Sequence, residues 1–250
     1  MKNVLFVSSV LALACTGFAQ KIVITTNYTA DPAPYVHGDT VYLYTTHDED
    51  NADGFMMYDW LLHTSTEMVN GTSHGAVASL GDIKWSSKTN GAWAEQVIER
   101  DGKWFMYVPI HGNGISVLVA DNPYGPFKEP LNKALVWQRE HWNDIDPTVW
   151  IDDDGQAYMY WGNPELYMIK LNKDMISTQG SIVTYPKTKD YQEGPWVYKH
   201  GDHYYMTFAS TCCAEGIGYA MSDKITGPWT YKGDIMPHSS RSNGNHPGII

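Results

Sequence analysis

Short runs of alternating apolar and polar positions recur along the chain, and most of them end in a turn that contains Gly or Asp. In four places two such runs, rich in β-branched and aromatic residues, flank one turn, which is the signature of a β-hairpin. The four hairpins cover residues 31–44, 93–107, 146–161 and 193–208. Their spacing of roughly 45 to 65 residues is typical of propeller blades. No helix-period segment longer than two turns follows residue 20, so the pattern predicts an all-β protein.

The first strand of each hairpin repeats one register. Counting back five residues from its last residue reaches Asp31, Trp93, Asp146 and Glu193. The first strand of a propeller blade lines the central channel as an edge strand, where a proline near its start is tolerated. Three of the four strands carry such a proline. We therefore expect the three carboxylates to face one funnel around the axis, although the sequence separates them widely.

The beginning of the chain has the form of a secretory signal, because Lys2 precedes a short apolar run and Gly17-Phe18-Ala19 resembles a cleavage site. We expect residues 1–19 to be removed, which leaves one propeller domain over residues 20–250 in a periplasmic or secreted protein. Lipoprotein processing at Cys15 is the alternative, although the preceding residues match its signal poorly. The apolar run is too short to span a membrane.

The end of the chain resembles one more first strand, Asn245–Ile250, in which His246 precedes a proline. The sequence stops before the turn that would follow. We therefore expect a five-bladed β-propeller in which four blades and the first strand of the fifth are present. An unclosed ring would leave unpaired backbone in water, so the pattern indicates a truncated chain.

Cysteine usage adds little to the functional interpretation. Once the signal is removed, only the neighbours Cys212 and Cys213 remain. Disulfide geometry disfavours adjacent residues, so two packed thiols are favoured over a vicinal disulfide, and the redox state stays open.

Composition narrows the class of ligand. The net charge of −11 argues against nucleic acid and anionic membranes, since both are bound by clustered Lys and Arg. Aromatic residues make up 13% of the chain, which suits both packing between sheets and stacking on sugar rings. Trp93 replaces an acid in the register, so we expect it to be a stacking platform for a sugar, and we assign Trp85 and Trp161 to the same sugar-binding set. The alternative is that Trp93 only plugs the axial end of its blade.

Paired carboxyl groups in an aromatic funnel are typical of glycoside hydrolases. One acid protonates the leaving oxygen, and a second carboxylate acts at the anomeric carbon. Glu193 is the better acid, because its side chain is longer, its neighbours are apolar and a charge on Asp146 would hold its proton. Asp31 is then the base that activates water. Asp146 orients the acid Glu193 and tunes its pKa. Glu95 lies two positions out of register and is left out of the catalytic set.

Four motifs in this order resemble glycoside hydrolase family 43: Asp31-Pro32-Ala33-Pro34, Asp146-Pro147-Thr148-Val149, Glu193-Gly194-Pro195-Trp196 and Asn245-His246-Pro247-Gly248. The resemblance implies a five-bladed propeller enzyme that acts on arabinose- and xylose-containing plant polysaccharides by a single-displacement, inverting reaction. It implies the same three roles for Asp31, Asp146 and Glu193. His246 is similar to the axial histidine of the family, which in many members lies beside calcium or water, so any calcium would be structural rather than required for the chemistry.

The sugar specificity is less defined by the sequence. The residues before Asp31 and the acidic stretch after His47 resemble members that release α-L-arabinofuranose from arabinoxylan, so we predict that activity. Arabinan and xylo-oligosaccharides are related partners, and β-xylosidase is the alternative activity. A non-catalytic sugar-binding propeller would keep the aromatic walls but would not need three acids in register.

Overall fold

The computed structural model describes residues 24–139, 142–211, 214–240 and 244–250. The expectations for the signal sequence, for Cys15 and for Cys212 and Cys213 lie outside the described residues. Within the described part the protein is almost entirely β-structure, and its one helix is the short 3-10 helix η1 (Leu80–Asp82). None of the helices described is long and apolar enough to cross a bilayer.

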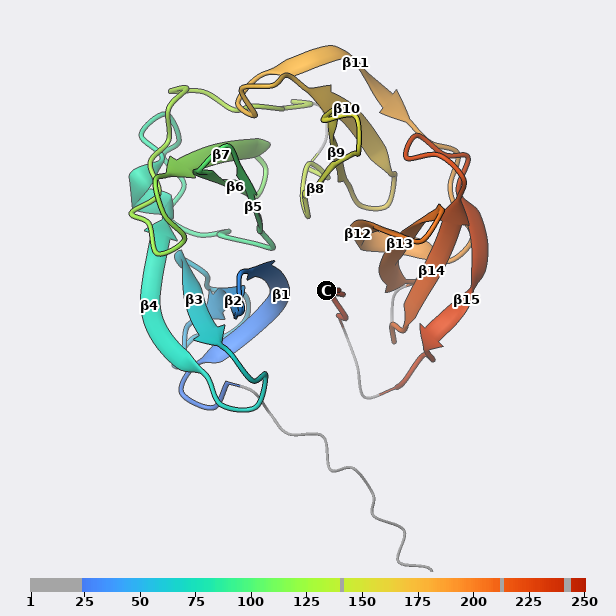
Figure 1. Ribbon diagram of the computed structural model, residues 1–250. Coiled ribbons are helices and arrows are strands. Elements are labelled where there is room, and N and C mark those ends of the chain that lie inside the picture. Colours follow the sequence, from blue (N-terminus) through green and yellow to red (C-terminus); the bar gives the residue numbers. More distant parts are fainter. Residues whose placement is uncertain (1–23, 140–141, 212–213, 241–243) are drawn as a thin grey trace, which may run out of the picture.

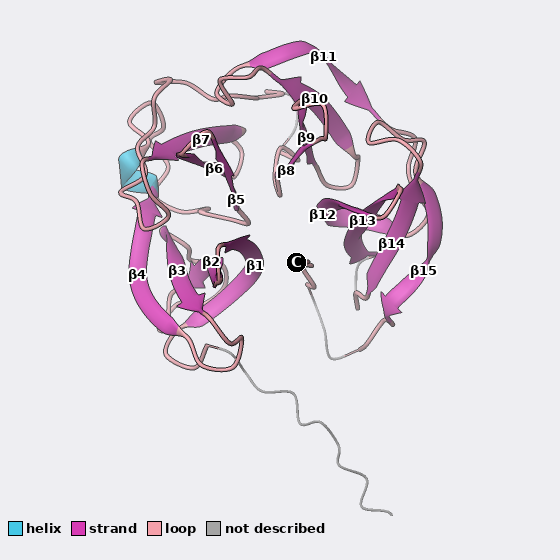
Figure 2. Ribbon diagram, viewed as in Figure 1, coloured by secondary structure: helices cyan, strands magenta, loops and turns pink. Residues whose placement is uncertain are grey.

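The described strands form four antiparallel sheets arranged around a central axis (Figures 1 and 2). The first sheet contains β1 (Tyr28–His37), β2 (Thr40–Asp48), β3 (Asp59–Ser65) and β4 (Thr72–Ser79). The second contains β5 (Gln96–Arg100), β6 (Lys103–Pro109) and β7 (Ile115–Ala120). The third contains β8 (Thr148–Ile151), β9 (Ala157–Trp161), β10 (Tyr167–Leu171) and β11 (Thr178–Thr184). The fourth contains β12 (Tyr191–His200), β13 (His203–Ser210), β14 (Ile217–Ser222) and β15 (Thr230–Met236).

Each sheet opens with one of the predicted hairpins, and its first strand is the innermost one (Figure 1). The inner strands of successive sheets contact one another, β1 with β5, β5 with β8 and β8 with β12. A turn of Gly with Asp or His between two β-prone runs is enough to direct the chain back on itself at each of these places. The prediction of an all-β propeller is therefore confirmed, with four blades.

The segment 244–250 enters the centre of the ring but is not the strand that the sequence predicted (Figure 1). A strand needs a ladder partner, and among the described residues this segment forms no ladder. It is held instead by Trp196, whose Nε1 donates to the carbonyl oxygen of Ile249 at 3.0 Å, and by close packing of Gly248 on Pro32. An irregular axial segment between β12 and β1 thus stands where we expected the first strand of a fifth blade.

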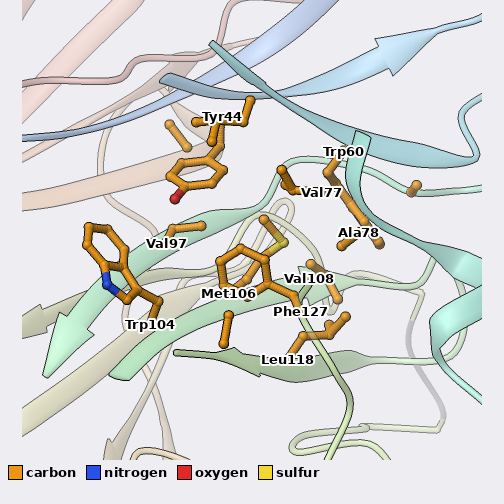
Figure 3. Packing of buried hydrophobic residues seen from close by; sticks show 14 of the residues in the cluster. Tyr44, Trp60, Val77, Ala78, Val97, Trp104, Met106, Val108, Leu118 and Phe127 are labelled. Atoms are coloured by element: carbon orange, nitrogen blue, oxygen red, sulfur yellow. The ribbon is translucent and has the colours of Figure 1, made fainter. Parts of the chain in front are cut away.

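The core is divided among the interfaces between neighbouring blades. Figure 3 shows the cluster between the first and second sheets, where Tyr44, Trp60, Val97, Met106 and Phe127 pack together. Two further clusters lie between the second and third sheets and between the third and fourth. Burial of each large apolar side chain stabilises the fold by roughly 1.5–3 kcal/mol. The aromatic excess of the sequence is therefore used largely for packing between blades.

Candidate active site

A cavity of ≈ 560 Å³ opens on the axis and is lined from all four blades and from the axial segment. Asp31, Asp146 and Glu193 all line it, together with Trp93 and His246. Asp31 and Glu193 lie within the first four residues of β1 and β12, and Asp146 lies two residues before β8, so each acid is near the start of the inner strand of its own blade. The structure thus brings into one cavity three carboxyl groups that are far apart in the sequence.

The backbone at these acids is irregular, and this irregularity directs their side chains. Asp31 and Asp146 have φ values of 50° and 57°, a left-handed conformation that Asp adopts more readily than most residues. The pairing of β1 with β2 shifts between Ala30 and Ala33, an interval that contains Asp31, and the pairing of β12 with β13 shifts on both sides of Glu193. A bulge re-aims one side chain of a strand, and strained backbone of this kind clusters at functional sites.

Asp31 occupies the more open part of the cavity. Its side chain is 22% exposed, and the Thr46 hydroxyl donates to Oδ2 at 3.1 Å. His246 Nδ1 lies 3.4 Å from Asp31 Oδ1. Burial lowers the pKa of His246, although the nearby charges of Asp31 and Glu215 oppose this, so the imidazole is neutral at neutral pH. A carboxylate supported by a hydroxyl and reachable from the cavity is suited to accept a proton from water.

Asp146 lies beside the backbone that follows Glu193. Asp146 is buried and accepts a hydrogen bond from the Gly194 backbone N–H at 3.0 Å. The Glu193 carboxyl accepts one from the Asn163 side-chain amide, which Gln192 in turn positions at 2.8 Å. These contacts fix the orientation of both acids.

Burial raises the pKa of Glu193 to about 7, and the charges of Glu215 and Asp31 add to the effect. Burial followed by the charge of Glu193 also raises the pKa of Asp146 well above its usual range. Two interacting carboxyl groups in a buried site do not readily ionise together, so the pair retains a proton at neutral pH. A carboxyl group that keeps its proton at neutral pH can act as a general acid.

Sequence reasoning missed further acids around the site. Glu215 and Asp48 line the cavity, although neither lies in the repeated register. Glu215 is in the turn between β13 and β14, and Asp48 ends β2, so no strand pattern would have singled them out. Glu95, which we left out, does not line the cavity; it is buried, and burial raises its pKa well above the usual range.

The three candidate tryptophans occupy different environments in the structure, and only one of them lines the cavity. Trp93 lines the cavity, and its ring stacks on His111 with centroids 4.0 Å apart. Trp161 is fully buried between the second and third blades, where its Nε1 donates to Asp144 Oδ1 at 2.8 Å. Trp85 packs on the first core cluster beside Trp137 and does not line the cavity.

The assignment of Trp85 and Trp161 to sugar binding is therefore corrected. Trp161 ends β9, a second strand with both of its faces packed, and Trp85 lies in the loop that follows η1. Alternation along a strand does not distinguish a side chain that faces the funnel from one that packs against a neighbouring blade.

Similarity to known proteins decides the family. The sequence profile described as Glycosyl hydrolases family 43 matches residues 20–249. The chain belongs to glycosyl hydrolase family 43. The resemblance seen in the four motifs is thereby confirmed.

The family 43 chain has relatives with named activities. It is 29% identical over 270 residues to a xylosidase/arabinosidase of Bacteroides ovatus, which covers 87% of the chain and 81% of that protein. It is 34% identical over 256 residues to an arabinoxylan arabinofuranohydrolase of Paenibacillus polymyxa, which covers 83% of the chain but only 40% of that protein. An α-L-arabinofuranosidase structure from Clostridium thermocellum superposes with a TM-score of 0.78 at 36% identity, over 91% of the chain and 80% of that structure.

The expected axial calcium is not supported by a set of protein ligands in this family 43 chain. Calcium takes six to eight oxygen ligands, whereas the described residues contain no group of three or more His, Cys, Asp or Glu that could hold a metal ion. His246 directs Nδ1 toward Asp31. An axial calcium ion held mainly by water stays a prediction.

Proposed function

We propose that this protein is a glycosidase that removes terminal α-L-arabinofuranosyl residues from arabinoxylan-type plant polysaccharide. The observation that carries the proposal is the meeting of Asp31, Asp146 and Glu193 in one cavity of ≈ 560 Å³. Ligand sites of roughly 300–1,000 Å³ accommodate small molecules, so the cavity is large enough for a sugar unit. The names of the Paenibacillus and Clostridium relatives support arabinofuranose as that sugar.

The proposed reaction rests on the different environments of Glu193 and Asp31. Glu193 donates its proton to the glycosidic oxygen as the bond from that oxygen to the anomeric carbon breaks. Asp31 takes a proton from a water molecule, whose oxygen attacks the anomeric carbon from the opposite face. The sugar leaves with inverted configuration, and such a single displacement needs roughly 6.5–9.5 Å between the two carboxyl groups to admit the water.

Asp146 supports this reaction without exchanging a proton with the sugar. Its carboxyl group holds the Gly194 N–H and so fixes the backbone next to Glu193. Burial, followed by the charge of Glu193, raises the pKa of the Asp146 carboxyl group, so the two groups do not readily ionise together. We therefore assign Asp146 the role of orienting and tuning the acid.

The second candidate activity is β-xylosidase. The Bacteroides relative is named for both activities, and arabinofuranose and xylose present similar hydroxyl patterns to a cavity. Rates on 4-nitrophenyl α-L-arabinofuranoside and 4-nitrophenyl β-D-xylopyranoside, together with arabinose release from arabinoxylan, separate the two. We expect arabinose release and the higher kcat/KM on the arabinofuranoside. Binding of arabinoxylan without release of any sugar would instead indicate a non-catalytic propeller.

The roles of the two acids are tested by Glu193→Gln and Asp31→Asn. Removing a general acid costs roughly 10²–10⁴ in rate, but 4-nitrophenolate leaves with little protonation. We expect Glu193→Gln to lose far more activity on arabinoxylan than on the aryl glycoside, and Asp31→Asn to lose activity on both. Equal losses of Glu193→Gln on the two substrates would contradict its assignment as the acid.

We also infer that the ring has five positions. The inner strands β1, β5, β8 and β12 occupy four of these positions, and the segment 244–250 lies between β12 and β1 in the place of a fifth.

Export, which the leader over residues 1–19 favours, would bring the enzyme to polysaccharides outside the cytoplasm.

A further inference from the structure

A fourth carboxyl group, that of Glu215, is built into the wall of the cavity. Its side chain is only 3% exposed, yet it lines the same cavity as the three acids of the proposed reaction. The neighbouring residue Gly216 is anchored, since Ser210 Oγ accepts from the Gly216 N–H at 3.1 Å and also contacts His238 Nε2 at 3.2 Å. Placing a further acid among buried acids is costly, so a stable fold retains one chiefly where it has a function.

Glu215 holds the axial segment in place. Its Oε2 accepts a hydrogen bond from the Asn245 backbone N–H at 2.8 Å, and its carbonyl oxygen accepts one from the Asn245 side chain at 2.8 Å. The next residue is His246, whose Nδ1 lies 3.4 Å from Asp31 Oδ1. His246 also packs on Gly194, because a Cβ placed there would lie 3.1 Å from Nδ1. Glu215 is therefore connected, through Asn245 and the adjacent His246, to Asp31 in β1 and to Gly194 in β12.

The groups around Glu193 are almost all acidic. They are Asp31 from β1, Asp48 from the end of β2, Asp146 from the loop before β8, Glu215 from the connection between β13 and β14 and the neutral His246 from the axial segment, with the Asn163 amide as hydrogen-bond donor. None of the described residues that line the cavity is a lysine or an arginine. After burial, the charge of Glu215 is the largest influence that raises the pKa of Glu193, and it precedes that of Asp31.

We propose that Glu215 is a positioning residue for the glycosidase reaction, which fixes the segment carrying His246 beside Asp31 and keeps Glu193 in its protonated form. This inference rests on the proposed function. It assigns two tasks to Glu215, which orders the axial segment through Asn245 and supplies a negative charge near Glu193.

The variant Glu215→Gln separates these two tasks, because the amide still offers an oxygen to the Asn245 N–H but carries no charge. We expect the alkaline limb of its kcat/KM profile to move to lower pH by about one to two units, the size expected of a like charge roughly 6–12 Å away at an effective dielectric constant near 20. Glu215→Asp keeps the charge and should leave that limb near its wild-type position. Asp202→Asn, in the exposed β12–β13 turn, makes the same change in net charge and is the matched control.

An alkaline limb at the same pH in Glu215→Gln and wild type would overturn the proposal, as would an equal shift in Asp202→Asn. The pH titration of the Glu193 carboxyl, followed by infrared or ¹³C NMR spectroscopy as the band lost in Glu193→Gln, needs no substrate. If wild type releases no sugar, the proposed function fails, whereas the spectroscopic comparison of wild type with Glu215→Gln still tests the effect of Glu215. If Glu215→Gln does not unfold cooperatively, Glu215→Asp decides, because a downward shift of the titration in that variant contradicts a role for the charge.

Discussion

Environment, rather than residue type, separates the tasks of the acids in this cavity. Asp31 is partly exposed and supported by the Thr46 hydroxyl, whereas Glu193 is covered and surrounded by other acids. Desolvation and like charges favour the neutral form of a carboxyl group. A proton donor and a proton acceptor are thereby available in one cavity at the same pH.

The raised pKa of Glu193 has a consequence for stability that is independent of catalysis. The folded protein holds this proton up to about pH 7, whereas an ordinary glutamate in the unfolded chain releases it near 4.5. Between these values the folded state binds more protons, so the free energy of unfolding decreases as the pH rises. We expect urea unfolding at pH 5 and pH 8 to show a smaller decrease for Glu193→Gln than for wild type. Parallel decreases in the two proteins would contradict the raised pKa, and Asp202→Asn is the control for net charge.

At the scale of the elements, the sequence was sufficient for the four hairpins and for the placement of three carboxyl groups. Both depend on a local signal, a turn between two β-prone runs, and on repetition of that signal in one register. Glu215 could not be found in this way, because it lies in a turn that belongs to no repeat. Trp161 was misassigned because a strand inside a blade is packed on both faces. The segment 245–250 has the composition of a strand, but strand formation depends on a ladder partner that composition does not reveal.

Gly248 tests the contact between the axial segment and β1. A Cβ on this residue would lie 2.2 Å from the carbonyl oxygen of Pro32, next to Asp31, and 2.5 Å from Pro34 Cδ. We expect Gly248→Ala to destabilise the protein by about 1–3 kcal/mol, as overpacking does, and to lower activity by displacing the segment or β1. Thermal unfolding and arabinose release are the measurements. Gly71→Ala is the control, since its Cβ would make only an ordinary 3.5 Å contact with Thr64; equal stability of the two variants would show that the contact carries no strain.

At the scale of the whole molecule, the blades act as a frame in which the first, third and fourth sheets each place one of the three acids at the axis. The inner strands of neighbouring blades contact one another, so the separation of Asp31, Asp146 and Glu193 depends on the packing between blades rather than on any single loop. The ring was predictable from the repeat, but the route of the axial segment was not, because it depends on contacts with two blades at once.

A calcium ion near His246 would stabilise the ring without taking part in hydrolysis. We expect exhaustive chelation to leave kcat on the aryl arabinofuranoside unchanged. A bound ion would add to stability by mass action, so a lower Tm after chelation that calcium restores would support an axial ion. Loss of activity on chelation, restored by calcium, would contradict a purely structural role, and magnesium at equal ionic strength is the control.

The stereochemistry of the first product tests the central claim most directly. Proton NMR of the reaction in its first minutes shows which anomer of arabinose is released before mutarotation. Single displacement with Asp31 as base and Glu193 as acid predicts that an α-L-arabinofuranoside yields the β-anomer first. Release of the α-anomer first would mean retention through a covalent intermediate, and it would contradict the mechanism proposed for this cavity.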